Sequence, residues 1–351
     1  MWTRRGWCRV CASALLGTVP PATWAQGPGP APLPRAGSSR VVVAVEDKTA
    51  FCYLPLTVAE RMGYFANEGL DVQVREFSDP GQALQAVLLG SAQVFSGPFS
   101  SIINMQARGQ MFQSFVLQGR APQIVLGVSL QTLGHYRGLR DLRGKKLGIM
   151  ALGSGTHKVA RLVLARAGLG AQDIQYTPLP SATSAVAAFR AGAIDAICYT
   201  DPVITQLEQG GELRVVADTR TLRGSAEVFG GTLPAACLSA PGAFLAGNAR
   251  QSQALTDAMV HALKWLQTAG PSDIIKVVPE RYFLGDRALY LAAFSRAREA
   301  WAPDGLMPED GPVTAARMLA YFDPSTQLQR VDLARTFTND FARKAKARFK
   351  A

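Results

Sequence analysis

Short apolar runs alternate with longer amphipathic stretches along most of the chain. Val41–Val45 is apolar at every position, which is typical of a strand covered on both faces. Asp71–Arg75 alternates polar and apolar residues and predicts a second strand. Between them, about Leu54 to Tyr64, apolar side chains recur at helical spacing. This order of elements predicts a protein built from layers of α and β structure.

The same order of elements recurs further along the chain. Additional strands or extended runs are predicted at Ala92–Phe95, Phe115–Leu117, Ile124–Val128, Lys145–Met150, Ile174–Pro178, Ala193–Tyr199 and Leu213–Val216. Asp79-Pro80 and Asp201-Pro202 each place a capping residue before a proline, which predicts a helix start. Two β-α-β-α-β stretches therefore stand in series, at about 40–125 and 145–218, without an obvious sequence repeat.

From about Ser252 onward the chain is mostly helical by its pattern. Helices are predicted at Ala254–Thr268, Arg287–Trp301, Thr314–Tyr321 and Asp332–Lys350. The last is amphipathic, and its expected buried side chains are Leu333, Phe337, Phe341 and Phe349. We expect these helices to cover the first α/β half.

Composition and charge narrow the choice of function. The 351 residues are 48% hydrophobic, enough for one large or two medium domains. The net charge of +11 is concentrated at the two ends, at Arg4, Arg5 and Arg9 and at Arg343, Lys344, Lys346, Arg348 and Lys350. No aromatic interleaving, zinc spacing or RNA-binding motif accompanies it, so we expect no nucleic-acid partner. The excess of positive charge has two other interpretations, a solvated basic face and a surface that attracts anions.

The first 25 residues are expected to be a signal peptide. Arg4-Arg5 precede an uncharged stretch from Val10 to Pro21, and Thr23-Trp24-Ala25 offers a cleavage site. The apolar run is too short and too interrupted for a membrane span. We therefore expect a periplasmic protein, exported by the general secretory or, given a loose twin-arginine pattern, the twin-arginine route. Residues 26–39 are rich in Pro, Gly and Ala and predict a flexible lead.

Cysteine and histidine usage predicts neither a metal nor a cofactor. Cys52, Cys198 and Cys237 remain after signal removal, an odd number without CxxC pairing. One disulfide with a free thiol is possible, but the apolar flanks favour three buried thiols. The three histidines do not stand at metal-ligand spacing.

The most informative polar segment is Gly153-Ser154-Gly155-Thr156-His157, between a predicted strand and a helix. Its glycines expose backbone N–H groups, the helix start adds partial positive charge, and the hydroxyls add donors. It predicts a cradle for an anion or polar group, with a plain turn capped by its threonine, Thr156, as the alternative. It lacks the Gly-Lys-Ser/Thr of a Walker A loop, and Lys158 replaces the third glycine of a dinucleotide fingerprint.

Three further loops follow strands, where ligands of open α/β sheets bind. The first holds Asp47 together with Phe51 and Tyr53, whose rings either stack on a planar ligand or pack inward. The second holds Pro98, Phe99 and Ser100, and the third holds Thr200 and Asp201. Asp201 is expected to cap a helix, which does not prevent it from contacting a ligand. Neither a Gly-x-Ser-x-Gly elbow nor HExxH occurs, so binding is expected without catalysis.

Four blocks of sequence carry a resemblance to one family. They are Tyr53–Val72, with GYFANEGLDV, then Ala86–Ser100, Asp141–Gly148, with the start of LRGKKLGI, and Phe189–Ala196. The chain resembles the nitrate, sulfonate, taurine and thiamine-precursor group of ABC-transporter substrate-binding proteins over about 40–245. The resemblance implies a type II periplasmic-binding-protein fold, with two α/β lobes joined by a two-strand hinge. It implies a first lobe of 40–122 plus 235–351 and a second of 123–234, with Gly127 and Gly230-Gly231 as hinges.

The resemblance also implies a function. A monomeric protein would capture a small polar or anionic organic solute between its lobes and deliver it to the permease and ATPase of an ABC importer. The family's ligand positions fall on the four loops named above. A thiamine-pyrimidine synthase and a sensory domain for a membrane partner are the alternatives. The synthases of this group carry a cysteine-rich motif where this chain has only Cys198, which disfavours that reading.

Overall fold

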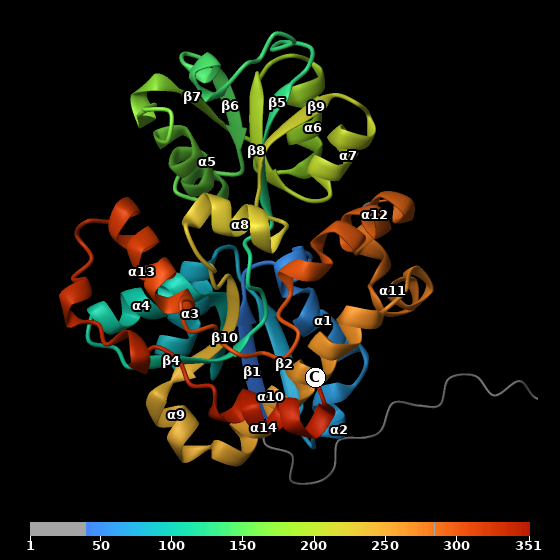
Figure 1. Ribbon diagram of the computed structural model, residues 1–351. Helices are drawn as coiled ribbons and strands as arrows, with labels where there is room; N and C mark the ends of the chain where they lie inside the picture. The colour runs from blue at the N-terminus through green and yellow to red at the C-terminus, as the bar shows by residue number, and fades with distance from the viewer. Residues whose placement is uncertain (1–39, 284) are drawn as a thin grey trace, which may run out of the picture. The chain divides into compact units, whose positions relative to one another are not determined.

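The computed structural model describes residues 40–283 and 285–351, which belong to one compact unit (Figure 1). The expectations for the signal peptide and the lead lie outside the described residues. Within them, no helix has the length and apolarity needed to cross a membrane.

The first sheet has the strand order β2-β1-β3-β10-β4. Its strands are β1 (Arg40–Val45), β2 (Asp71–Glu76), β3 (Val94–Pro98), β4 (Phe112–Leu117) and β10 (Ala236–Pro241). Strand β1 is parallel to β2 and β3, whereas β10 is antiparallel to both β3 and β4. The carboxyl ends of β1, β2 and β3 therefore lie at one edge, where the loops after them gather.

The second sheet repeats this plan with the order β7-β6-β8-β5-β9. Its strands are β5 (Ile124–Ser129), β6 (Lys146–Ile149), β7 (Gln175–Pro178), β8 (Ala196–Thr200) and β9 (Leu213–Asp218). Strand β5 is antiparallel to β8 and β9, and β6 is parallel to β7 and β8. Each sheet thus has one antiparallel strand next to its edge, and the predicted pair of α/β halves is confirmed.

Helices connect the strands and cover the sheets. Those of the two halves are α1 (Leu54–Arg61), α2 (Tyr64–Asn67), α3 (Pro80–Leu88), α4 (Phe99–Ala107), α5 (Gly155–Ala165), α6 (Ala182–Arg190), α7 (Val203–Gln209) and α8 (Leu222–Phe229). The predicted start of α3 is confirmed, because Asp79 Oδ1 accepts a hydrogen bond of 2.9 Å from Gln82 N and Pro80 opens the helix.

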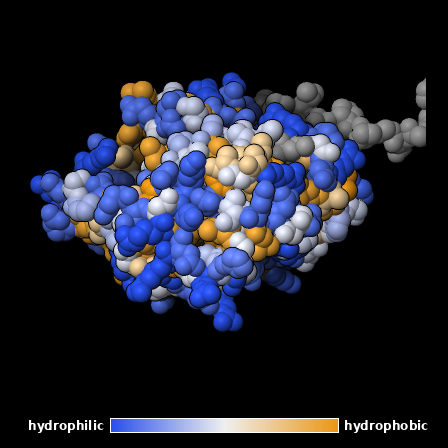
Figure 2. Space-filling model, turned by 90° about the horizontal axis from the view of Figure 1, so that it is seen from above, coloured by the Kyte–Doolittle hydropathy of each residue, from blue (hydrophilic) through white to orange (hydrophobic). Residues whose placement is uncertain are grey.

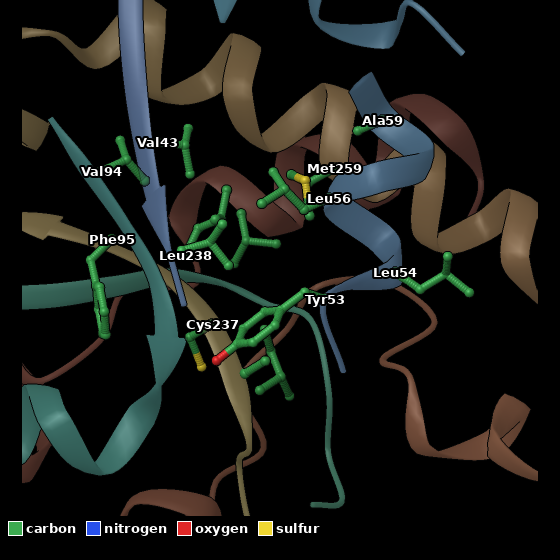
Figure 3. Packing of buried hydrophobic residues seen from close by; sticks show 14 of the residues in the cluster. Val43, Tyr53, Leu54, Leu56, Ala59, Val94, Phe95, Cys237, Leu238 and Met259 are labelled. Atoms are coloured by element: carbon green, nitrogen blue, oxygen red, sulfur yellow. The ribbon is translucent and has the colours of Figure 1, made fainter. Parts of the chain in front are cut away.

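The C-terminal helices complete the core of the first half. They are α9 (Gly242–Gly247), α10 (Ala249–Thr268), α11 (Pro271–Val277), α12 (Arg287–Ala297), α13 (Gly311–Phe322) and α14 (Asp340–Phe349). Figure 3 shows Met259 of α10 facing Leu56 and Ala59 of α1. Phe294 and Leu319 belong to the same core, so the prediction that these helices pack on the first half is confirmed.

Short 3-10 turns link several of these elements. They are Phe51–Tyr53, Leu139–Leu142, Ala171–Asp173, Glu280–Phe283, Arg298–Ala300, Leu328–Arg330 and Leu333–Arg335.

Both faces of the second sheet are buried. Leu126 and Cys198 pack into one apolar cluster, while their chain neighbours Val125 and Ile197 pack into another, because successive side chains of a strand point to opposite faces. The three cysteines among the described residues are free thiols. Cys198 and Cys237 are buried as expected, whereas Cys52 is partly exposed. The surface seen in Figure 2 is mostly hydrophilic, with apolar residues in small scattered groups.

Three details differ from the expectations. Helix α8 has no counterpart among the predicted helices, since it is short and contains Gly224. Helix α14 begins at Asp340, eight positions after the predicted start, because Asp332 instead caps the turn at Leu333–Arg335. Gly127 lies within β5 against Leu213, so it is part of the second sheet.

Candidate functional site

Two chain segments pass between the sheets, at about 118–123 and 230–235. The first touches both halves. Gln118 N donates to Ala236 O at 2.8 Å, and Gln118 Nε2 donates to Ser96 Oγ at 2.9 Å. At the other end of the segment, Ile124 lies opposite Thr200 of β8. The first crossing segment therefore runs from the end of β3, at Ser96, to the end of β8, at Thr200.

The predicted loops of the first half reach these crossing segments. Trp301 Nε1 donates to Phe51 O at 2.8 Å, and Trp301 forms a bridge with Gly119, which ties the loop after β1 to the first segment. Phe99 N donates to Ala235 O at 2.9 Å, which ties the loop after β3 to the second segment.

The predicted loops of the second half reach the same place. A Cβ atom on Gly155 would lie 3.3 Å from Ile124 Cδ1, so the start of α5 lies against the first residue of β5, where the first crossing segment ends. Thr200 pairs with that same Ile124. All four predicted loops are thus gathered around the two crossings.

Hydroxyl groups stabilise the turn Gly153–His157 from within. Thr156 is 1% exposed, and its Oγ1 accepts from Met150 N at 3.0 Å. Ser154 Oγ donates to Ala151 O and caps α5 by accepting from His157 N. The N–H groups of Gly155 and Thr156 open the helix and have no intrahelical acceptor. Donors to a ligand would therefore come from the backbone here, and the predicted hydroxyl donors are already engaged.

His157 also supports this turn. Its Nδ1 accepts from Gly153 N at 2.9 Å, which requires an unprotonated nitrogen at that position. Burial, with Arg161 and Lys158 nearby, lowers the pKa of the imidazole below 6.5. Its ring packs edge to face against the ring of Tyr176, with the two ring centroids 4.5 Å apart. At neutral pH the imidazole is therefore uncharged and acts as an acceptor within the protein.

The aromatic residues after β1 face the core. Phe51 is 6% exposed and stacks on Tyr290 of α12, with the two ring centroids 4.8 Å apart. Tyr53 is 2% exposed, and Figure 3 shows its ring pointing inward toward the end of β10 that carries Cys237. Of the two alternatives for these rings, this structure has the inward packing. A ligand-stacking role for them stays a prediction.

An acidic residue that the sequence reasoning did not single out, Glu46, contacts the hydroxyl of Tyr53. Tyr53 Oη donates to Glu46 Oε1 at 2.7 Å. Burial raises the pKa of the Glu46 carboxyl, although the Tyr53 hydrogen bond lowers it. The exposed Asp47 accepts from Thr49 N and Oγ1 at 2.8 and 2.6 Å, so its carboxylate closes the loop.

The loop after β3 presents donors at a second helix start. Pro98 precedes α4, and Phe99 is wholly buried. Ser100 is half-buried in the first turn, where backbone N–H groups have no intrahelical partner. Ser100 therefore remains a candidate donor together with the backbone next to it.

Both carboxylate oxygens of Asp201 contact other residues of the protein. Its Oδ1 accepts from Thr205 N at 2.9 Å and from Thr205 Oγ1 at 2.8 Å, in the first turn of α7. The expected cap is displaced by one residue, because Pro202 is the N-cap and α7 begins at Val203. Its Oδ2 lies 3.4 Å from Arg220 Nη1. Burial raises the pKa of Asp201, against the opposing effect of Arg220. Thr200, beside it, is half-buried at the end of β8.

Arg220 was missed by the sequence reasoning. It is 3% exposed and also pairs with Asp218 at 2.6 Å and Glu208 at 2.9 Å. Burial opposes its charge, but hydrogen bonds to Asp218 and Glu208 raise its pKa overall. The pattern of a single cation among separated acids gives no signal in a sequence, because the fold alone brings them together.

Comparisons with known proteins agree with this geometry. The model of the NMT1-like family matches residues 49–278. A solved protein of Bordetella bronchiseptica RB50 is 46% identical, covers 89% of this chain and 98% of its own, and has a TM-score of 0.79. A comparison with curated proteins found no match.

Two more distant solved structures share the fold. The periplasmic aliphatic sulphonate binding protein of Escherichia coli is 18% identical, with 86% of this chain and 92% of that one covered and a TM-score of 0.67. The periplasmic nitrate-binding protein of Synechocystis PCC 6803 is 14% identical, with 90% of each chain covered and a TM-score of 0.65. The predicted periplasmic-binding-protein fold is confirmed, and so is the resemblance to this group of proteins.

Proposed function

The chain belongs to the NMT1-like family, and on that premise we propose that it is an exported solute-binding protein of an ABC importer. It captures a small polar or anionic organic solute, such as a sulfonate or a pyrimidine, and delivers it to the membrane permease and its ATPase. The observation that carries the proposal is the gathering of four loops, two from each sheet, around the crossing segments. The sulphonate- and nitrate-binding neighbours of the same fold support it.

The helix starts at this place suit a polar or negatively charged head group. Helices α4 and α5 begin beside the crossing segments and present backbone N–H groups with partial positive charge. Ser100 adds a hydroxyl group, and Thr200 adds another from the second half. The remainder of the solute would meet the loop Asp47–Tyr53.

Capture by closure follows from the arrangement of the lobes. We assign 40–122 and 235–351 to the first lobe and 123–234 to the second, so that along the chain only the crossing segments connect them. A solute that bridges loops of both lobes stabilises the closed state by its differential contacts, and the importer would recognise that state. The protein would act as a periplasmic monomer.

Turnover is not part of the proposal. Cys198, which lies where the pyrimidine synthases of this group carry their cysteine-rich motif, is wholly buried within β8. Burial raises the pKa of its thiol, so it is not a ready nucleophile. His157 is held as an acceptor for Gly153 N.

Thermal-shift screening of purified residues 26–351 tests the proposal, with sulfonates, nitrate, pyrimidines and flavins as probes. A solute at about 100 times its Kd stabilises the folded state by about 2.7 kcal/mol, a shift of several degrees in Tm. Calorimetry then gives the Kd of each solute found. A folded protein that no small solute stabilises would contradict the proposal.

A charge-matched pair of variants locates the site. Ser100→Asp places a negative charge at the start of α4 and should abolish binding of an anionic solute. Ser91→Asp places the same charge on an exposed residue just before β3, at the opposite end of that strand, and should leave the Kd unchanged. Equal binding by both variants would move the site elsewhere.

A further inference from the structure

An ion-pair network links the loop after β8 to a helix of the other lobe. Arg220 pairs with Asp201, Asp218 and Glu208, all within the second lobe. Glu208, on α7, also pairs through the same Oε2 atom with Arg296 of α12. Helix α12 is anchored in the core of the first half through Tyr290. A chain of charges thus runs from Asp201, beside the proposed solute site, across to the first lobe.

The network holds more carboxylates than cations, and Arg296 reduces this excess of negative charge. Asp201, Asp218 and Glu208 carry three negative charges, and Arg220 alone supplies one positive charge inside the second lobe. Arg220 and Asp201 are each only 4% exposed in their side chains, and Glu208 17%, so water screens these charges weakly. Arg296 supplies the second cation from the other lobe. Separation of the lobes would withdraw it and leave the three carboxylates with one partner.

We propose that Arg296, acting through Glu208 and Arg220, is a positioning residue that couples the solute loop at Thr200-Asp201 to closure of the two lobes. The inference rests on the proposed function, because it describes how that same site is controlled. When the lobes close, Arg296 neutralises Glu208. Glu208 then has a second cation and attracts Arg220 less strongly. Arg220 therefore keeps its position beside Asp201.

Other contacts between the lobes set the scale of the effect. Leu222 N donates to Glu299 Oε1 at 2.8 Å, and Arg317 of α13 donates to Phe229 O at 3.1 Å. Arg296 itself is 44% exposed in its side chain. Its removal should therefore weaken closure partially, with a Kd for the solute that rises roughly two- to tenfold. The change should appear mainly in koff, since the closed complex is what loses the contact.

The test compares two arginine variants on one helix. Arg296→Gln removes the cation that crosses between the lobes. Arg287→Gln removes a cation whose side chain is similarly exposed, at 54%. Its partner Glu280 lies in the same C-terminal region, with 2.5 Å between Arg287 Nη2 and Glu280 Oε2. X-ray scattering of the solute-free proteins should show a larger radius of gyration for Arg296→Gln than for Arg287→Gln. This measurement needs no solute, so its outcome is separate from that of the proposed function.

Solute binding and salt supply the second readout. The Kd of a solute found by screening should rise for Arg296→Gln and stay unchanged for Arg287→Gln. The wild-type Kd should rise with added salt more than that of Arg296→Gln, because salt screens the crossing pair. Arg296→Lys keeps the charge and should restore most of the affinity.

Equal radii of gyration for the two glutamine variants would overturn the proposal, whether or not a solute is known. So would equal Kd values, or a lysine variant as weak as Arg296→Gln at equal thermal stability.

Discussion

The hydroxyl of Tyr53 lies 2.7 Å from Oε1 of Glu46 and donates a hydrogen bond to it. Tyr53→Phe removes this donor from a carboxyl whose pKa burial already raises. We expect the pKa of Glu46 to rise further and the free energy of unfolding to fall by about 1–2 kcal/mol. NMR titration of the Glu46 carboxyl and urea unfolding measure the two effects. Tyr321→Phe, on an exposed ring, is the control, and an unchanged Glu46 titration would contradict the expectation.

Glu46 should make the stability of the protein depend on pH. Because its folded pKa lies above the ordinary value of 4.5, the folded state holds this proton more tightly than the unfolded state. Stability is therefore lost as the pH rises from 4.5 through the raised pKa of Glu46. Glu46→Gln, which still accepts from Tyr53, should flatten this part of the curve.

The measurement is urea unfolding at a series of pH values between about 4 and 8. Glu227→Gln, at an exposed residue, should follow the wild-type curve. If Glu46→Gln kept the wild-type dependence of the unfolding free energy on pH, that dependence would arise from another titrating group.

Arg220 should be essential for the stability of the second lobe. Arg220→Gln leaves Asp201, Asp218 and Glu208 without their shared cation, and we expect a loss of about 3–5 kcal/mol in the free energy of unfolding. Arg223→Gln, three positions along and 90% exposed, should unfold like the wild type. Chemical denaturation measures the free energy of unfolding of both variants. Equal values for Arg220→Gln and Arg223→Gln would mean that the carboxylates do not depend on Arg220.

His157 should titrate below its ordinary range in a salt-dependent way. Burial contributes most to its lowered pKa, and Arg161 and Lys158 contribute the rest. The small stability that its neutral form provides is present above pH 6.5 and is lost as the pH falls through the lowered pKa. Added salt should screen the two cations and raise this pKa toward 6.5. NMR titration of the imidazole tests this, since the chain has only three histidines.

His261 is the internal control for the salt effect. Burial also lowers its pKa, but Glu68 opposes Lys264 and Arg348 there, so its titration should respond less to salt. An equal response of both histidines would show that local cations do not set the pKa of His157.

Features that depend on near neighbours in the chain were predictable. Asp79-Pro80 correctly predicts the start of α3, because a cap and its helix are encoded within a few residues. At α5 a threonine was the expected cap, but Ser154 occupies that position and Thr156 lies inside the helix. The alternation in Asp71–Arg75 and the apolar run Val41–Val45 likewise identify β2 and β1. The positions of the four site loops followed from the rule that ligands bind beyond the carboxyl ends of strands.

Features that depend on distant partners were not predictable. Phe51 is stacked by Tyr290, which lies far along the chain, so nothing local could show whether its ring faces the core or a ligand. Arg220 and Arg296 become interpretable only when α7 and α12 are seen together. Helix α8 was missed because Gly224 weakens its local helical signal, although its N-cap Thr221 accepts from Gly224 N.

The place of β10 has a consequence for biosynthesis. All strands of the second sheet lie between Ile124 and Asp218, so that half can assemble as soon as it has left the ribosome. The first sheet cannot, because β10 sits between β3 and β4 and arrives only after the second half is finished. Until then both strands present open hydrogen-bonding edges, which makes the half-made chain a natural client for chaperones that shield exposed strands.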